Sequence, residues 1–346
     1  MNVAIIGCGK VSGGHIKAWL DRDDAQVTML VDVAEDLACE TRDELELPAN
    51  IAISTRYEDA LENDDIDIVD ICTPSHLHAE QIIAGLRAGK HMVVEKPTGY
   101  TLEECRLLRY ERLLHPEPKV AVAYSLRYYP VNVEAKRLLV EGAIGEIIAG
   151  QFTWNHPHDF TDHEPRYPDR SAPGYGLLAD LGGKYIPSSE AAGPTHPFDL
   201  ARHMMGGQAE EVFACRKRYG ITCVATFQGG AACTIVGGSA ASQGLRNPTV
   251  VLVQGTHGTI VTSMNKAGEY TGVIADKDGE RPIEAGSDTG HGDITRTENI
   301  LAAIRDDEPL IASLEDSITS SEFLHAIWDS YEHGIRIPVH TAHKTG

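Results

Sequence analysis

The stretch NVAIIGCGKVSGG, residues 2–14, decides the fold of this chain. Asn2–Ile6 is a mostly apolar run of strand length, and a glycine-rich turn follows it. The spacing of apolar residues over Val11–Leu20 then predicts a helix. A strand, a glycine turn and a helix in this order open a βαβ unit. We therefore expect the N-terminal part of the chain to be an α/β domain.

The same alternation of strand and helix continues to about residue 122. Further strand-like runs are Val27–Val31, Ile51–Ser54, Ile66–Cys72, His91–Val94 and Val120–Tyr124. Helical patterns separate them at Ala34–Leu45, Tyr57–Glu62, Ser75–Ala88 and Leu102–Leu114. Continuous apolar strands joined by helices predict a parallel sheet that is covered on both faces. Residues 1–122 are thus predicted to form a doubly wound Rossmann domain.

The pattern of predicted strands and helices changes after residue 122. A helix is predicted at Val131–Glu141, and two more at Thr295–Arg305 and Leu314–Tyr331. Strand-like runs lie at Ile147–Trp154, Val212–Arg216, Thr222–Phe227, Ala231–Val236, Thr249–Gln254, Thr259–Thr262 and Gly272–Ala275. Successive strands joined by short turns favour an antiparallel sheet. Residues 123–346 are predicted to be an α+β domain, an open and mostly antiparallel sheet with helices on one face.

Composition narrows the class of protein. The 346 residues fit two domains, and no apolar run approaches the roughly 20 residues that span a bilayer. The formal charge of −21 disfavours nucleic acid and anionic membranes as partners. Adaptation to high salt is left open as another reason for the acidity. Seven scattered cysteines without a C-x-x-C pair indicate neither a disulfide framework nor a structural zinc site. The N-terminus has no signal-peptide pattern, so we expect a cytoplasmic protein.

The glycine turn predicts a dinucleotide site. Gly7 and Gly9 fit the first two glycines of G-x-G-x-x-G, and Ser12 replaces the third. Gly9 would let the backbone approach a pyrophosphate, and the helix N-terminus at Lys10 and Val11 would supply N–H groups to it. Asp32 ends the second strand and would accept hydrogen bonds from the adenosine ribose. Val33, Ala34 and Glu35 follow Asp32, so no arginine is close to it, which favours NAD over NADP, and Val33 is a further expected cofactor contact.

More candidate site residues follow the fourth and fifth strands. Thr73, Pro74 and His78 come after Ile66–Cys72, and the triplet Glu95-Lys96-Pro97 comes after His91–Val94. The carboxyl ends of parallel strands line the ligand crevice of such sheets. We therefore expect these residues along the same edge as the glycine turn and Asp32, with Lys96 as a proton donor or a hydroxyl-binding group.

These motifs together resemble the Gfo/Idh/MocA oxidoreductases. The resemblance rests on Glu95-Lys96-Pro97, on Thr73-Pro74 with His78, and on three later segments. Those segments are Arg127–Pro130, Gly142–Ile147 and Thr195–Arg202. The resemblance implies a nicotinamide cofactor at a crevice between two domains, a sugar, inositol or related cyclic polyol as substrate, and a homodimer or homotetramer formed through the C-terminal sheet.

The resemblance also implies a catalytic set. Lys96 matches the lysine of the E-K-P motif, and Asp180 and His196 match the aspartate and histidine of the motif D-x-G-x-H. Residues 183–195 stand before His196 where the family pattern has a single residue, which is an apparent insertion of 12 residues. Because of this insertion, Lys184 and Tyr185 stay open as alternatives to His196 for the acid/base. The inserted stretch is expected to be a loop that forms part of a substrate wall.

The implied roles follow the chemistry of hydride transfer. His196 would exchange a proton with the substrate hydroxyl, Asp180 would orient His196, and Lys96 would hydrogen-bond the substrate oxygen. Glu95 is expected to reach the nicotinamide ribose. Further substrate ligands are expected at Arg127, Tyr185 and Asp199. The histidines at 156, 158 and 163 have no known metal-ligand spacing, so no metal is predicted.

The sequence leaves two other functions open. One is an enzyme that keeps NAD bound and cleaves glycosides through transient oxidation, without net formation of NADH. The other is a sensor of sugar or NAD that catalyses nothing. The first interpretation remains an NAD-dependent dehydrogenase acting on CH–OH groups. The presence of Lys96, Asp180 and His196 disfavours the sensor.

Overall fold

The computed structural model describes residues 1–99, 101–155, 195–217, 220–238, 249–265, 267–286 and 292–339. The chain forms two compact units. Unit 1 comprises Met1–Tyr128 and Asp288–Ile318, and unit 2 comprises Tyr129–Ser287 and Thr319–Gly346. This division differs from a single cut at residue 122, because a late segment of the chain returns to unit 1.

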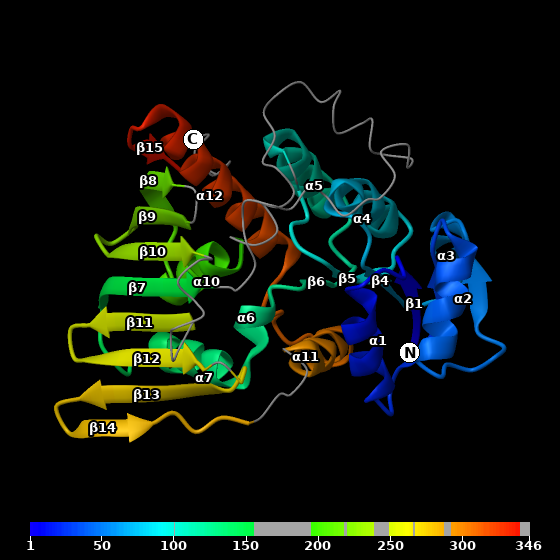
Figure 1. Ribbon diagram of the computed structural model, residues 1–346, viewed down its shortest axis with the longest axis horizontal. Coiled ribbons are helices and arrows are strands. Elements are labelled where there is room, and N and C mark those ends of the chain that lie inside the picture. Colours follow the sequence, from blue (N-terminus) through cyan, green and yellow to red (C-terminus); the bar gives the residue numbers. More distant parts are fainter. Residues whose placement is uncertain are drawn as a thin grey trace. The chain divides into compact units, whose positions relative to one another are not determined.

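Unit 1 contains a six-stranded parallel sheet in the order β3-β2-β1-β4-β5-β6 (Figure 1). The strands are β1 (Asn2–Ile6), β2 (Gln26–Val31), β3 (Ala52–Ser54), β4 (Ile68–Ile71), β5 (His91–Val94) and β6 (Val120–Val122). The helices between them are α1 (Ser12–Leu20), α2 (Glu35–Glu44), α3 (Glu58–Leu61), η1 (Ser75–Leu77), α4 (His78–Arg87) and α5 (Leu102–Leu114). A short helix, α6 (Ser125–Tyr128), follows β6. The predicted doubly wound Rossmann order is confirmed.

Both faces of this sheet are buried, which explains why its strands lack alternation of polar and apolar residues. Val3 and Ile5 of β1 pack with residues of α1 and α11 (Asp293–Asp306) on one face. Ala4 and Ile6 pack with residues of α4, α5 and the start of α12 (Leu314–His333) on the other. Ile300, Leu301, Leu314 and Ile318 are thus core residues of unit 1, so their segment belongs to it.

Unit 2 contains a nine-stranded sheet in the order β14-β13-β12-β11-β7-β10-β9-β8-β15. The strands are β7 (Ile147–Asn155), β8 (Ala209–Lys217), β9 (Gly220–Phe227), β10 (Ala232–Gly238), β11 (Thr249–Gly255), β12 (Gly258–Met264), β13 (Tyr270–Asp276), β14 (Gly279–Pro282) and β15 (Ile337–Pro338). Only β7 and β10 pair in parallel among these described strands. The predicted, mostly antiparallel sheet is confirmed.

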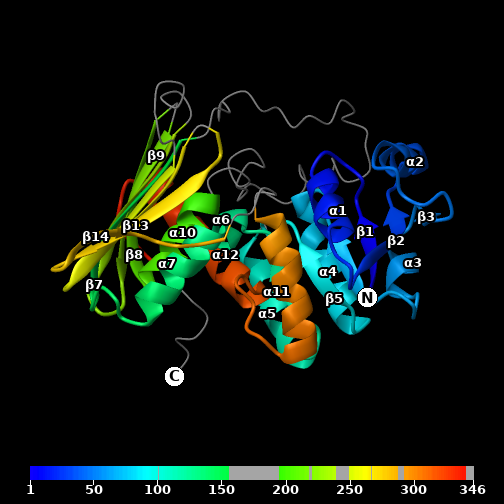
Figure 2. The same cartoon turned by 90° about the horizontal axis from the view of Figure 1, so that it is seen from below.

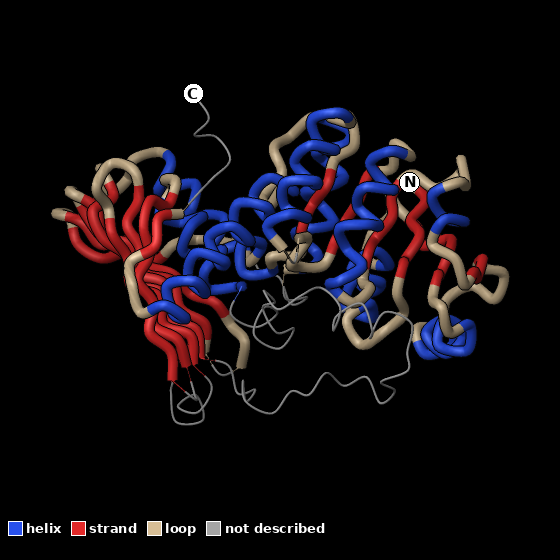
Figure 3. Tube along the Cα trace, turned by 90° about the horizontal axis from the view of Figure 1, so that it is seen from above, coloured by secondary structure: helices blue, strands red, loops and turns tan. Residues whose placement is uncertain are grey.

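The helices in the described part of unit 2 lie on one face of its sheet (Figures 2 and 3). They are α7 (Pro130–Val140), α10 (Thr195–Met205) and most of α12. The ring centroid of Phe323 in α12 lies 6.5 Å from that of Phe198 in α10 and 6.4 Å from that of Phe227 in β9, so these aromatic rings pack between helices and sheet. The opposite face of the sheet carries no helix among the described residues. No helix in the described part of the chain is long and apolar enough to cross a membrane.

Candidate active site

The glycine turn lies between β1 and α1 and has two different glycines. Gly7 has a φ of +94°, and a Cβ there would lie 2.9 Å from backbone atoms of Cys72 and Thr73. Its N–H donates to the Val31 carbonyl at 2.7 Å. A Cβ at Gly9 would meet no atom within 4 Å, so the backbone there faces open space. Gly7 therefore brings the ends of β1 and β4 together, and Gly9 leaves room for a phosphate group.

Asp32 closes the other side of the turn. Its carboxylate accepts hydrogen bonds from the Cys8 N–H at 2.8 Å and from the Ala34 N–H at 2.9 Å. These bonds hold the half-buried carboxylate at the carboxyl end of β2. Lys10 and Val11 are exposed beside the start of α1, and Val33 is 84% exposed next to Asp32. This arrangement fits an adenosine diphosphate group, with the ribose hydroxyls toward Asp32.

His78 joins the loops that follow β4 and β5. One ring nitrogen lies 2.8 Å from the Pro97 carbonyl oxygen and the other 2.7 Å from that of Thr73. The side chain is buried, and its two contacts hold the loop of Thr73 and Pro74 against the loop that carries Lys96. The contact of His78 with the cofactor stays a prediction.

Glu95 and Lys96 extend this edge directly after β5. The Lys96 ammonium nitrogen lies 3.9 Å from a Glu95 carboxylate oxygen, and the two side chains are 15% and 16% exposed. Burial raises the pKa of Glu95, but the hydrogen bond with His15 and the charge of Lys96 outweigh it and hold the pKa well below its usual range. Lys96 therefore presents a cation, with an ionised carboxylate beside it, at the edge that also carries the glycine turn.

Arg127, a predicted substrate ligand, is buried and paired within unit 1. Only 1% exposed, it donates from Nη1 to the Ile311 carbonyl at 3.1 Å and lies 3.3 Å from an Asp316 carboxylate oxygen. Its guanidinium also stacks over the Tyr124 ring. These contacts connect α6 to the chain around the start of α12, and the role of Arg127 as a substrate ligand stays a prediction.

In unit 2, His196 is the second residue of α10. Its half-buried ring lies 6.2 Å from the Trp154 ring of β7, measured between centroids. Asp199 is 1% exposed and accepts a hydrogen bond from the Ser320 hydroxyl of α12 at 2.6 Å. Asp199 thus joins α10 to α12 in the interior, and its role as a substrate ligand stays a prediction. Asp180, Lys184 and Tyr185 lie outside the described residues.

Sequence reasoning missed a buried polar network beneath Glu95. His15 of α1 lies 2.8 Å from Asp70 of β4 and 3.2 Å from Glu95. The Trp19 indole N–H donates to the other Asp70 carboxylate oxygen at 2.7 Å. Arg296 of α11 is buried nearby, and its charge acts on both Asp70 and Glu95. The available signal was Asp70 itself, the one acidic residue inside the otherwise apolar strand Ile68–Ile71.

Three side chains of this network have metal-binding atoms close together. One ligand atom each of His15, Asp70 and Cys72 lies within 4.8 Å of the others. These contacts are hydrogen bonds. The Cys72 thiol donates to an Asp70 carboxylate oxygen at 3.6 Å, and His15 Nδ1 lies 2.8 Å from the same oxygen. Burial raises the pKa of Cys72 to about 12, so the thiol stays protonated, whereas metal ligands are thiolates. This cluster is therefore a hydrogen-bonded network.

Comparison with known proteins assigns each of the two units to a protein family model. The family model described as "Oxidoreductase family, NAD-binding Rossmann fold" matches residues 1–112, and the model of the GFO/IDH/MocA C-terminal domain matches residues 132–261. The chain is 33% identical over 153 residues to levoglucosan dehydrogenase of Pseudarthrobacter phenanthrenivorans, covering 43% of this chain and 36% of that protein. It is 26% identical to myo-inositol 2-dehydrogenase of Thermotoga maritima, covering 62% of this chain and 58% of that one. The chain thus spans about a third to three fifths of these curated relatives.

Solved structures share the fold over nearly the whole chain. A levoglucosan dehydrogenase in complex with NADH and levoglucosan superimposes with a TM-score of 0.79 at 21% identity, covering 99% of this chain and 100% of that one. An oxidoreductase from Agrobacterium radiobacter in complex with NAD+, L-tartaric acid and magnesium gives a TM-score of 0.80 at 18% identity, covering 98% of each chain. At these identities the likeness shows the fold.

The glycine turn, the acidic end of β2 and the Glu95-Lys96 edge lie in the region that matches the NAD-binding model, and the sheet of unit 2 lies largely in the region that matches its companion domain. The chain belongs to the Gfo/Idh/MocA family of oxidoreductases, and NAD is the cofactor of its Rossmann domain.

Proposed function

We propose that this protein transfers a hydride between NAD and a hydroxyl-bearing carbon of a sugar, an inositol or a related cyclic polyol. The observation that carries the proposal is the edge of the parallel sheet, where open backbone at Gly9, the Asp32 carboxylate and the Lys96 ammonium occur together. The relatives named levoglucosan dehydrogenase, myo-inositol 2-dehydrogenase and D-apiose dehydrogenase support this substrate class.

The side chains of the candidate site would have different roles in the hydride transfer. NAD, when bound, supplies the acceptor or donor of the hydride. Lys96 would hydrogen-bond the reacting oxygen and stabilise negative charge on it. His196 would take the hydroxyl proton in oxidation and return it in reduction, with Asp180 orienting the ring. Because the insertion separates Asp180 from His196, Lys184 and Tyr185 stay alternatives for this acid/base, and Tyr185 a candidate substrate ligand.

The function is tested by following the absorbance of NADH while the purified protein is given NAD and a panel of aldoses, inositols, anhydrosugars and sugar acids. We expect saturable NADH formation with at least one cyclic polyol or sugar. No NADH formation with any member, from a protein that binds NAD, would contradict the dehydrogenase.

A second function is favoured by a specific relative. The chain is 28% identical over 162 residues to a glycosyl hydrolase family 109 protein of Shewanella pealeana, covering 45% of this chain and 35% of that one. A glycoside-cleaving enzyme that keeps NAD bound would release free sugar from aryl glycosides without net NADH. Measuring both products in the same assay distinguishes the two functions.

The cofactor preference gives a first prediction. NAD should bind at least about 10-fold more tightly than NADP, because the Asp32 carboxylate accepts ribose hydrogen bonds and repels a 2′-phosphate. Replacing Asp32→Ala should narrow this gap by removing both effects. Titration of each nucleotide by protein fluorescence measures it, with Glu35→Ala, an exposed acidic residue of α2, as the matched control. Equal affinity of the native protein for both nucleotides would overturn the prediction.

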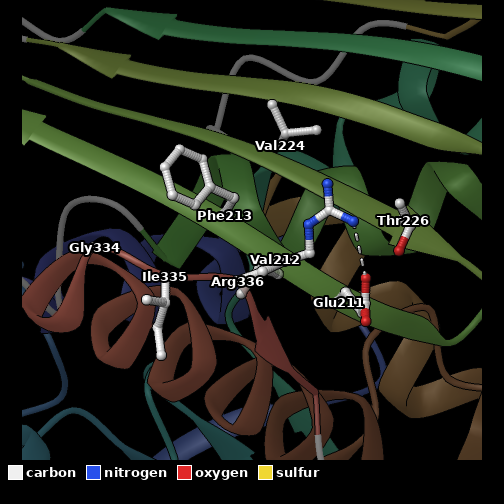
Figure 4. Close-up of a pocket in the computed structure, with 8 residues that line it drawn as sticks. All are labelled: Glu211, Val212, Phe213, Val224, Thr226, Gly334, Ile335 and Arg336. Atoms are coloured by element: carbon white, nitrogen blue, oxygen red, sulfur yellow. Dashed lines mark ion pairs between the residues drawn. The ribbon is translucent and has the colours of Figure 1, made fainter.

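The bare face of the unit 2 sheet supports the proposal of a homo-oligomer. Cross-strand pairing places one row of side chains across this face, formed by Phe213, Val224, Thr234, Gln151, Leu252, Val261 and Val273. The row contains no charged residue although the chain carries a formal charge of −21. At one end it continues into an apolar pocket of about 510 Å³ beside Ile335, rimmed by the Glu211–Arg336 ion pair (Figure 4).

A second copy of the chain fits this face best. Nine strands spaced about 4.8 Å apart make a face roughly 40 Å wide, which suits the roughly 800 Å² per partner of a stable interface. The uncharged row of side chains would also lessen the repulsion between two acidic chains.

The oligomer gives a second prediction. Val224→Lys should dissociate the assembly to monomers, because it buries an unpaired ammonium in the interface. Light scattering after size-exclusion chromatography measures the mass. Leu113→Lys, at a 75% exposed position of α5, is the control and should leave the mass unchanged. A native protein that is monomeric at micromolar concentration would contradict the proposal.

A further inference from the structure

The buried network beneath Glu95 connects α1 to the candidate catalytic lysine. Asp70 accepts from the Trp19 indole, Asp70 contacts His15, and His15 contacts Glu95. Glu95 in turn lies 3.9 Å from the Lys96 ammonium. His15 is 2% exposed and Asp70 is fully buried. A path of direct contacts therefore leads from the interior of the Rossmann unit to Lys96.

The geometry fixes the protonation of His15. Its Nδ1 lies 2.8 Å from Asp70 Oδ1, and its Nε2 lies 3.2 Å from Glu95 Oε1. Ionised carboxylates only accept hydrogen bonds, so both ring nitrogens must carry a proton if both contacts are hydrogen bonds. The ring is then an imidazolium between two carboxylates. Burial lowers the pKa of His15, but the charge of Asp70 and its hydrogen bond raise it well above its usual value.

The surrounding charges balance. Cations face Glu95 from α1 (His15), from the end of β5 (Lys96) and from α11 (Arg296), while anions come from Asp70 of β4 and Asp293 of α11. The other titratable groups nearby are the Cys72 thiol of β4 and His78 of α4. Three cations thus meet three carboxylates, counting Glu95 itself. Removing the His15 charge would leave an excess of negative charge in the interior.

We propose that His15 is a positioning residue that acts on Lys96 through Glu95. The imidazolium holds the Glu95 carboxylate ionised and in one orientation, and that carboxylate holds the Lys96 ammonium where the substrate oxygen must lie. The proposal rests on the proposed hydride-transfer function for its effect on turnover. The charge state of His15 and its hold on Glu95 do not depend on any substrate.

The first test uses the protein without nucleotide or substrate. Proton–nitrogen NMR spectra of ¹⁵N-histidine-labelled protein report the protonation of each ring, and contacts to the Trp19 indole proton assign His15. We expect the His15 ring to remain doubly protonated at neutral and mildly alkaline pH, where an ordinary histidine is neutral. A His15 ring that loses a proton between pH 5 and 8 would overturn the proposal, and this holds whatever reaction the enzyme catalyses.

The second test asks whether His15 acts through Glu95. His15→Gln should lower kcat roughly 10- to 100-fold at pH 7 by misplacing the lysine, with little change in NAD affinity. Without the imidazolium, burial raises the pKa of Glu95, so its carboxylate gains a proton as the pH falls. The acid limb of the kcat profile should therefore begin at a higher pH in the variant than in the native enzyme.

A double variant separates positioning from stability. If His15 acts only through Glu95, adding His15→Gln to Glu95→Gln should change kcat by less than about 2-fold. Two other outcomes would overturn the proposal. One is that the two losses multiply, and the other is that His15→Gln lowers Tm while kcat and its pH profile stay native. If His15→Gln does not fold, the NMR titration of the native protein still decides.

Discussion

Replacing Lys96 with methionine is expected to lower turnover about 100-fold or more, with little effect on NAD affinity. Methionine keeps the length and the apolar contacts of the lysine stem but cannot donate a hydrogen bond or carry charge. The native ammonium lies beside the ionised Glu95 carboxylate at the carboxyl end of the sheet. Its loss removes the group that would stabilise negative charge on the substrate oxygen.

The measurement is kcat on the best substrate of the panel, with NAD affinity from fluorescence titration and folding from circular dichroism. Lys119→Met is the matched control, because Lys119 is a partly exposed lysine of the same unit paired with Asp307. The control should turn over as the native enzyme does. If Lys96→Met folds, binds NAD and keeps native turnover, Lys96 has no part in the chemistry and the proposed mechanism fails.

The parts of the fold that could be predicted from sequence are those with local causes. The turn between Asn2–Ile6 and Ser12–Leu20 contains two glycines of the motif. Gly7 has a positive φ, and Gly9 has open space around it, which are the two properties that the motif predicts. The strands of unit 1 could be predicted because burial on both faces demands continuous apolar residues. Gly7, Gly9 and Asp32 could be placed for the same reason, since each lies at the end of such a strand.

Contacts between distant segments could not be predicted. Nothing in the pattern of Asp293–Asp306 shows that Ile300 and Leu301 pack on the Rossmann sheet, so a single boundary at residue 122 leaves out the late segment of unit 1. Arg127 and Asp199 are polar residues in family-like segments, yet both are buried and paired. Charge alone does not distinguish a residue that meets a ligand from one that meets another helix.

The buried network shows this limit most clearly. His15, Asp70, Glu95 and Arg296 come from four elements, and the contacts of His15 span 55 and 80 residues of sequence. From the sequence alone, each of these residues would be interpreted as a solvent-exposed charge or as a histidine on a helix surface. Only the strand Ile68–Ile71, with the sequence IVDI, indicates such a network, because a carboxylate in a strand buried on both faces requires hydrogen-bond or charge partners.

Arg296→Met is expected to destabilise unit 1 by about 3–5 kcal/mol, the usual cost of removing one partner from a buried ion pair. Arg296 is 1% exposed and donates to Asp293 at 2.6 Å. Burial lowers the pKa of Arg296, but the negative charges of three carboxylates outweigh burial and raise this pKa above its usual value. The carboxylates are those of Asp293, Asp70 and Glu95. Methionine would leave these carboxylates with one cation fewer in a medium that solvates charge poorly.

The matched control lies on the same helix. Arg305 of α11 is 46% exposed and pairs with Asp24, so Arg305→Met should cost less than about 1 kcal/mol. Urea unfolding followed by tryptophan fluorescence, with Trp19 buried in unit 1, measures both variants. Similar losses for the two would show that the buried charge balance does not stabilise unit 1.

The pH dependence of this loss tests its electrostatic cause. In the native protein the pKa values of Asp70 and Glu95 are held low although burial raises them, because His15 and the other cations outweigh it. Stability from such carboxylates is present above their unfolded pKa values of about 4 and is lost as the pH falls further. Without Arg296 the two pKa values are depressed less, so less stability remains to be lost in acid. The gap between native and Arg296→Met should therefore be constant above about pH 4 and narrow only as the pH falls below the pKa values of the two carboxylates in the folded variant, whereas a gap caused by lost packing alone would not change with pH.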